Sequence, residues 1–346
     1  MKSIYGFDLG TMNLVSAKSL GEDNIEIKSN RNMFTEIDSD TISITELEKT
    51  DLDYVTLEDG DDHKIFVIGE DSFRFNQIFN QIPRRPMKDG LISPEEVDAQ
   101  DIIGLMVKQL IEETQNGVCV YSIPAPIIGK VSSSVSYHEK VFSNILSSLG
   151  YKSKALNESS AVVFSDCKKE KNSGIGISFG CGLTNIACLY RGVNALQFSI
   201  DKGGDWIDNC SSAYTNVSVS RITSIKEKHL NLNENSFKEF KKKDRNVLQA
   251  LKCYYVELIK VVIKSIDKQF KSSNGGLEID EEIPIVISGG TSMVPGFLEL
   301  FKEEFEEVKN FPYSISEIRK VKDPLSATAI GCLKYALWKG NEFDDR

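Results

Sequence analysis

The sequence lacks the residue clusters of a zinc finger or of a disulfide-stabilised secreted domain. Its seven cysteines stand singly with no CxxC pair, and its three histidines are not clustered. Metal fingers and disulfide frameworks both need several such residues at short, regular spacings. Both classes are therefore disfavoured, and scattered thiols of this kind fit the reducing cytosol.

The sequence also lacks a basic excess and any long apolar run. Its 41 Lys and Arg against 51 Asp and Glu give a formal net charge of −10, whereas general nucleic-acid binders are normally basic. No run approaches the roughly 18 apolar residues of a transmembrane helix. The chain enters a predicted strand at "MKSIYGFDLG" without a signal peptide, and its acidic end is too short for a helix lying on a membrane. We expect a soluble cytoplasmic protein without membrane insertion or direct nucleic-acid binding, although a local basic face stays possible.

What the sequence does contain is an alternation of short apolar runs and amphipathic segments. With 346 residues it is long enough for two domains. Buried strands are predicted at 117–123 and 283–288, and helical spacing of apolar residues at 98–114, 137–149, much of 205–275, 297–305 and 325–338. Strands that alternate with helices predict an α/β fold.

A weak internal repeat relates the two halves of the chain. "FDLGTMNLVSA" (7–17) and "ISFGCGLTNIA" (177–187) share an apolar strand that ends in a glycine turn, so that Asp8 corresponds to Ser178 and Gly10 to Gly180. The two copies are separated by about half of the chain. The repeat predicts two similar halves that face each other across a cleft, each beginning with a glycine hairpin.

Glycine turns of this kind are suited to phosphate. Glycine lets a ligand approach the backbone closely, and consecutive N–H groups in a turn form an anion site. Asp8, beside the first turn, is placed to hold Mg²⁺ through water, because that ion keeps much of its hydration. A lone glycine turn is usually only a tight hairpin. Three turns at strand ends, counting "IVISGGTSMVPG" (285–296), indicate a nucleotide.

Eight segments resemble the actin-like ATPase superfamily, which also contains sugar kinases and the ATPase domains of heat-shock chaperones. "FDLGTMN" and "ISFGCGLTN" resemble its two phosphate loops, and "IVISGGTSMVPG" its adenosine motif. "NESSAVV" (157–163) and "DPLSATAIGCLKYA" (323–336) resemble its connecting segments, and "IKEKH" (225–229) an actin segment at the adenosine. "RPMKDGLI" (85–92) and "VKDP" (321–324) are most similar to bacterial-type actins such as MreB and MamK.

The resemblance implies two ribonuclease-H-like lobes with a nucleotide cleft between them. Lobe I is expected to comprise residues 1–160 and 326–346, and lobe II residues 161–325 with a helical subdomain at about 205–275. The implied ligands are ATP or ADP with Mg²⁺.

The resemblance also implies a role for individual residues. Asp8 would bind the magnesium through water, and Glu158 would orient the attacking water. The phosphates would be surrounded by Gly10, Thr11 and Asn13 from lobe I and by Gly180, Gly182 and Thr184 from lobe II. The nucleoside would contact Lys226 and Glu227 at the adenosine, Gly204 and Asp205 on the ribose side, and Gly289, Gly290 and Thr291 at the adenine.

Simpler structural interpretations compete with several of these roles. Glu158 could be a helix N-terminal residue favoured by the helix dipole. Lys226 and Glu227 could lie on a solvated helix face, and Gly289–Gly290 could be a plain turn between a strand and a helix. The assignments of Asp8 and of the glycines are supported jointly by three motifs.

Ser178 stands where the family usually has an aspartate that serves the magnesium or its waters. Serine brings a hydrogen bond but no charge. Loss of an outer-sphere partner at a metal site typically costs about 10–100-fold in affinity or activity. The substitution is therefore compatible with nucleotide binding and with slowed hydrolysis.

The function that these features favour is a cytoplasmic, actin-like cytoskeletal ATPase. It would polymerise into a homopolymer filament, with slow hydrolysis controlling disassembly and with a cargo or adaptor protein as a further partner. The chain leaves no room after its last motif for a chaperone's peptide-binding domain, and no substrate-binding set of a sugar kinase is recognisable. The alternative is a monomeric chaperone-like or adaptor nucleotide switch with weak or no hydrolysis; a small-molecule kinase ranks third.

Overall fold

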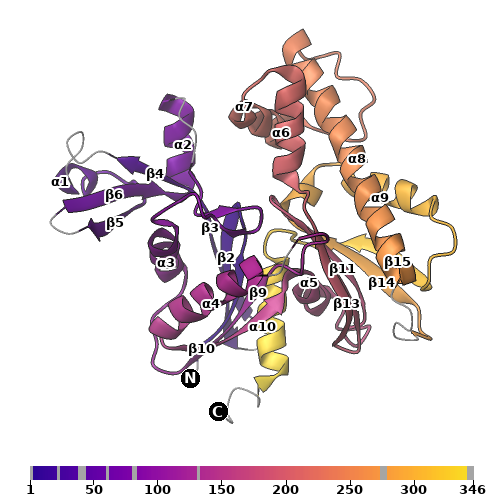
Figure 1. Ribbon diagram of the computed structural model, residues 1–346, viewed down its shortest axis with the longest axis horizontal. Coiled ribbons are helices and arrows are strands. Elements are labelled where there is room, and N and C mark those ends of the chain that lie inside the picture. The colour runs from indigo at the N-terminus through magenta and orange to yellow at the C-terminus, as the bar shows by residue number, and fades with distance from the viewer. Residues whose placement is uncertain are drawn as a thin grey trace.

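Two α/β halves lie side by side in the computed structural model (Figure 1). It describes residues 3–21, 24–37, 44–59, 62–79, 84–130, 133–272 and 279–340. All seven cysteines are free thiols. Within these ranges, the structure contains no helix with the length and apolar character of a membrane span.

The first half is built on a five-stranded mixed sheet with the order β10-β9-β1-β2-β3. Its strands are β1 (Ile4–Leu9), β2 (Asn13–Gly21), β3 (Asn24–Arg31), β9 (Gly117–Ile123) and β10 (Tyr151–Asn157). Helices α3 (Ala99–Leu110) and α4 (Ser133–Ser148) pack their apolar faces on it and form the core of this half. Both helices were predicted from their apolar spacing.

The second half repeats this plan with the order β13-β12-β11-β14-β15. Its strands are β11 (Gly174–Phe179), β12 (Thr184–Tyr190), β13 (Val193–Ile200), β14 (Ile283–Ser288) and β15 (Ile315–Lys320). Strand β11 runs antiparallel to β12 and parallel to β14, as β1 does to β2 and β9. Asp8 and Ser178 thus lie on equivalent strands. The predicted fold of two ribonuclease-H-like lobes is confirmed.

Two helices fill the space between the sheets. They are α5 (Glu158–Asp166) and α10 (Ala327–Trp338), and they share an apolar cluster with β9, β12 and β14. A Cβ on Gly331 of α10 would lie 1.8 Å from the carbonyl oxygen of Ala161. The helices cross this closely because position 331 has no side chain. The predicted lobe boundary at 160–161 falls inside α5.

Further elements extend both halves (Figure 1). In the first half they are β4 (Phe34–Ile37), β5 (Tyr54–Asp59), β6 (Asp62–Ile68), α1 (Ile44–Leu47) and α2 (Gly69–Phe79), with the short hairpin β7 (Met87–Lys88) and β8 (Leu91–Ile92). In the second half they are α6 (Gly204–Thr215), α7 (Val219–His229) and α8 (Lys242–Ser272), with η1 (Gly290–Met293) and α9 (Phe297–Glu306). Three helices thus occupy most of the segment predicted to be helical.

Candidate functional site

A cavity of about 460 Å³ lies between the two halves. The turns that follow β1 and β11 both line it, one from each half. It is also lined by all the predicted site residues except Thr184 and Asp205, namely Asp8, Gly10, Thr11, Asn13, Glu158, Ser178, Gly180, Gly182, Gly204, Lys226, Glu227, Gly289, Gly290 and Thr291. Residues from distant parts of the sequence are therefore brought to one place.

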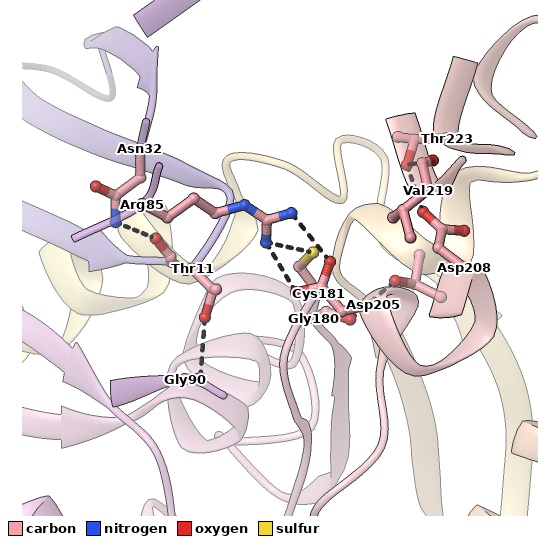
Figure 2. Close-up of polar contacts among 12 residues, drawn as sticks. Thr11, Asn32, Arg85, Gly90, Gly180, Cys181, Asp205, Asp208, Val219 and Thr223 are labelled. Carbon is pink, nitrogen blue, oxygen red and sulfur yellow. Dashed lines mark hydrogen bonds and ion pairs between the residues drawn. The ribbon is translucent and has the colours of Figure 1, made fainter. Parts of the chain in front are cut away.

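The β1–β2 turn is fixed by groups from outside its own hairpin. Asn32 donates a side-chain hydrogen bond to the carbonyl oxygen of Gly10 at 2.9 Å. The backbone N–H of Gly90, in the β7–β8 turn, donates to the hydroxyl of Thr11 at 3.0 Å (Figure 2). Such contacts pre-form the turn before any ligand arrives.

The β11–β12 turn is held by the helical part of the second half. The carbonyl oxygen of Gly180 accepts hydrogen bonds from the Thr291 hydroxyl at 2.8 Å and from the Gly204 N–H at 3.1 Å. The Asp205 N–H donates to the carbonyl oxygen of Cys181 at 2.8 Å. This turn, the start of α6 and η1 are therefore connected directly.

Thr184 and Asp205 do not line the cavity. The buried Thr184 hydroxyl donates to the carbonyl oxygen of Lys202 at 2.8 Å, which ties β12 to the end of β13. The Asp205 carboxylate pairs with Arg85 from the first half. In this structure both side chains are engaged with protein groups beside the cavity.

Two carboxyl groups, those of Asp8 and Glu158, line the cavity. One carboxylate oxygen of Asp8 accepts from the Ser122 hydroxyl at 2.8 Å. Glu158 is the first residue of α5, whose N-cap Asn157 accepts from the N–H groups of Ser159 and Ser160. Glu158 therefore combines the helix N-terminal position of the simpler interpretation with access to the cavity.

Asn185 fixes the orientation of Glu158. Its amide N–H donates to Oε2 of Glu158 at 2.9 Å, and its oxygen accepts from the Ala125 N–H at 3.0 Å and from the Ser199 hydroxyl. An amide held at both ends cannot rotate freely, so Glu158 is presented to the cavity in one orientation.

Burial sets the protonation of both carboxyl groups. It raises the pKa of Asp8, and the hydrogen bond from Ser122 opposes that rise. It also raises the pKa of Glu158; the neighbouring Asp8 charge adds to the increase, and hydrogen bonds from Ser178 and Asn185 oppose it. Raised values are expected where carboxyl groups share a poorly solvated site, because each charge disfavours the other.

The nucleoside side of the predicted site contains a buried ion pair. The Lys226 ammonium lies 2.7 Å from the Asp208 carboxylate, with only 13% of the Lys226 side chain exposed. Thr223 donates to the same carboxylate oxygen at 2.7 Å. Glu227 is 43% exposed and lies 3.6 Å from Arg31 of the first half. Lys226 is therefore not on a solvated face, whereas Glu227 is.

The sequence alone did not single out Ser122, Asp208, Arg31 or Arg85. Ser122 could have been found from topology, because β9 lies beside β1 in the sheet and brings it to Asp8. Arg85 begins the segment RPMKDGLI, but nothing near it or near Arg31 in the sequence indicates their partners, because those partners lie far away along the chain.

The fold and the family follow from comparison with known proteins. The chain is similar to the structure "MamK double helical filament", with a TM-score of 0.72, 19% identity and coverage of 97% of this chain and 99% of that chain. It is similar to MreB5 of Spiroplasma citri bound to ADP, with a TM-score of 0.63, 13% identity and coverage of 100% and 99%. It also resembles the ethanolamine utilization protein EutJ from Carboxydothermus hydrogenoformans, with a TM-score of 0.53, 16% identity and coverage of 97% and 90%.

No curated protein matches the chain in sequence. The family model described as Volactin matches residues 3–336. Because this match spans nearly the whole chain and the solved structures share its architecture, the chain has the actin-like ATPase fold and belongs to the Volactin family.

Proposed function

We propose that this protein is an actin-like ATPase that binds ATP with Mg²⁺ between its lobes and polymerises into filaments. Slow hydrolysis then controls their disassembly. One observation carries the proposal: two equivalent glycine turns, from opposite halves, line one cavity together with Asp8 and Glu158. Turns rich in backbone N–H groups bind phosphate oxygens, and two facing turns suit a chain of phosphates.

The residues present fit a magnesium nucleotide. Ser122 engages one oxygen of Asp8, and the other forms no hydrogen bond to the described residues. Magnesium in nucleotide sites is commonly held by one or two carboxylates, phosphate oxygens and water, so Asp8 would hold it through water. The ion would supply charge neutralisation for the phosphates.

Glu158 is the residue that we assign to the attacking water. Asn185 orients its carboxyl group, and burial raises its pKa, which strengthens it as a proton acceptor once it is ionised. Phosphoryl transfer depends mainly on positioning and electrostatic stabilisation. A carboxylate held in one orientation beside the phosphate turns meets the first requirement.

Phosphate release at saturating ATP and Mg²⁺ tests this assignment. We expect Glu158→Ala and Glu158→Gln to slow release by about 100-fold, in the range observed for acid–base groups, while fluorescent ATP is still bound. Equal rates in the wild type and in the variants would remove Glu158 from the mechanism.

Self-association is the second part of the proposal. The MamK structure is described as a double helical filament, and a head-to-tail contact repeats without limit unless it closes into a ring. Light scattering, pelleting and electron microscopy with ATP and Mg²⁺ should show filaments that disappear after hydrolysis. Protein that stays monomeric at high concentration with bound ATP would contradict this part.

Ser178 favours one alternative, an adaptor nucleotide switch with weak or no hydrolysis. The actin-like ATPase superfamily usually has an aspartate at this position. A hydroxyl in place of that carboxylate reduces the negative charge available to a metal. Bound nucleotide with no phosphate release and no increase in light scattering would support this second function.

A further inference from the structure

Arg85 crosses from the first half of the molecule to the second at the edge of the cavity. It precedes β7, and its guanidinium binds both carboxylate oxygens of Asp205, with N–O distances of 2.8 and 3.1 Å (Figure 2). The same Nη1 lies 3.6 Å from the sulfur of Cys181. Asp205 is in the first turn of α6, and Cys181 is in the β11–β12 turn.

The geometry makes this pair stronger than an ordinary surface ion pair. A planar guanidinium that meets both oxygens of a carboxylate is held in distance and in angle. The Arg85 and Asp205 side chains are only 22% and 24% exposed. Partial removal from water reduces screening of the attraction, whereas fully exposed pairs contribute little.

The contact acts directly on the second glycine turn. The N–H groups of Gly204 and Asp205 bind the carbonyl oxygens of Gly180 and Cys181. The first turn of α6 and the β11–β12 turn therefore move together, and Arg85 attaches both to the first half.

A second contact of the same segment supports the attachment. A Cβ on Gly182 would lie 2.6 Å from the backbone nitrogen of Gly90, so the β11–β12 turn touches the β7–β8 turn. Gly90 also binds the Thr11 hydroxyl. The segment 85–92 thus contacts both glycine turns, and separating the halves must break the Arg85–Asp205 pair.

Two other ion pairs join the halves among the described residues. Lys130 lies 2.6 Å from Asp201, but these side chains are 50% and 43% exposed, so water screens their attraction more than that of Arg85 and Asp205. Arg31 lies 3.6 Å from Glu227, which is 43% exposed, and Arg31 bonds Glu70 of its own half at 2.5 Å. Opening the cavity leaves that stronger Arg31 contact in place, whereas it leaves Arg85 without its carboxylate.

We propose that Arg85 and Asp205 form a latch that holds the halves closed over the cavity and sets the rate at which a bound nucleotide leaves. Arg85 is a positioning residue: it acts through Asp205 and the β11–β12 turn and is not among the residues that line the cavity. The inference rests on the proposed nucleotide site for its kinetic consequence, but the latch itself rests only on protein contacts.

Arg84 provides a matched control. It is the neighbouring arginine and bonds two carboxylates, Glu36 at 2.7 Å and Glu96 at 2.7 Å, but both belong to the first half. Arg84→Ala therefore removes an equally bonded guanidinium without removing a bridge between the halves.

The test is a double-mutant cycle on the release of methylanthraniloyl-ATP, chased with unlabelled ATP at protein concentrations where light scattering detects no assembly. We expect Arg85→Ala and Asp205→Ala each to speed release about tenfold or more, the range for hydrogen bonds between charged groups. The double variant should be no faster than the faster single variant. Arg85→Lys should lie between Arg85→Ala and wild type, and Arg84→Ala should match wild type.

Unchanged release in Arg85→Ala, or single effects that multiply in the double variant, would overturn the latch. Small-angle scattering of the nucleotide-free protein gives a second readout, in which Arg85→Ala should have a larger radius of gyration than wild type and Arg84→Ala should not. If wild type binds no labelled nucleotide, the proposed function fails. The scattering comparison then decides the latch by itself, and equal radii would overturn it.

Discussion

Ser178 lies on β11 where Asp8 lies on β1, and it supplies a hydroxyl at a position equivalent to a carboxylate. It is 3% exposed, and its hydroxyl lowers the pKa of the Glu158 carboxyl group against the larger effect of burial. An aspartate at position 178 would share the cavity with the carboxylates of Asp8 and Glu158. Its effect on the stability of the protein therefore depends on whether a divalent cation is bound.

We expect Ser178→Asp to lower the Mg²⁺ concentration for half-maximal ATPase activity about tenfold, because outer-sphere carboxylates at metal sites typically contribute that much. In EDTA the same variant should melt at a lower temperature than wild type, because the added charge is then uncompensated. Ser178→Asn is the neutral control and should show neither effect. An unchanged magnesium dependence in Ser178→Asp would place Ser178 outside the metal's surroundings.

His138 is a buried base that the proposed mechanism does not use. It is fully buried in α4 against Phe142, and neither ring nitrogen has a hydrogen-bond partner among the described residues. Burial lowers the pKa of His138 to about 3, whereas an unfolded histidine has a pKa of about 6.5. Below about pH 6.5 the unfolded chain takes up a proton at His138 that the folded chain does not, so a lower pH favours the unfolded chain.

The free energy of unfolding should thus decrease by about 1.4 kcal/mol per pH unit from this group alone as the pH falls from about 6.5 toward 3. Between pH 7.5 and 5, His138→Leu should lose about 2 kcal/mol less stability than wild type in urea titrations. Because the stability of each protein at pH 5 is compared with its own stability at pH 7.5, the effect of leucine on packing cancels. Equal losses would mean that His138 is solvated or paired in the folded protein.

At the scale of elements, the crossing of α5 and α10 determines how the two sheets sit together. A Cβ added at Gly331 would lie 1.8 Å from a backbone carbonyl oxygen. A backbone atom cannot move aside as the end of a flexible side chain can. Gly104, also inside a helix, differs, because a Cβ there would lie 3.9 Å from Ile145, an ordinary contact.

Alanine at these two glycines should therefore have opposite effects on the free energy of unfolding. Gly331→Ala should destabilise the protein by at least about 1–3 kcal/mol through overpacking. Gly104→Ala should stabilise it by about 0.5–1 kcal/mol, because alanine loses less backbone entropy in a helix. Denaturant titrations measure both, and equal stabilisation by both substitutions would contradict the close crossing.

At the same scale, the regular elements followed from local patterns. The apolar residues of α3 and α4 recur at helical spacing, and Gly150, with a φ of 86°, ends the α4 segment as predicted. The prediction that 205–275 is mainly helical was less accurate, because residues 230–241 contain no helix in the structure. There Leu230, Leu232 and Phe237 are buried by tertiary contacts rather than by helical periodicity.

For the whole molecule, the cavity between the halves predicts coupling of ligand binding to global stability. A ligand that contacts both halves in the folded state stabilises it by about 2.7 kcal/mol at one hundred times its dissociation constant. For a chain of 346 residues this corresponds to roughly 4 °C in melting temperature.

ATP with Mg²⁺ should produce that shift, and ATP with EDTA should produce a smaller one, because the cation that we propose to bind at Asp8 is then absent. Adenosine at the same concentration should shift the melting temperature least, since it has no phosphates for the glycine turns to bind. Differential scanning fluorimetry makes the comparison. A shift of equal size for adenosine and ATP would show that the glycine turns do not bind the phosphates.

The sequence by itself determined the features that depend on neighbouring residues: the α/β class, the two glycine turns, their equivalence, and Asp8 beside the first of them. These depend on hydrophobic periodicity, on glycine and on residues within one hairpin, all of which can be read locally. The residues of the candidate site came from the resemblance of several motifs to one fold, and the structure brings most of them to one cavity.

Only the tertiary structure decided which side chains meet across the halves. Arg85 pairs with a residue 120 positions away, Lys226 is buried against Asp208, and Asp205 and Thr184 bond to protein groups beside the cavity. Each of these arrangements depends on the distance and direction between elements, and on burial that changes the strength of a charge. No pattern within a single segment contains that information.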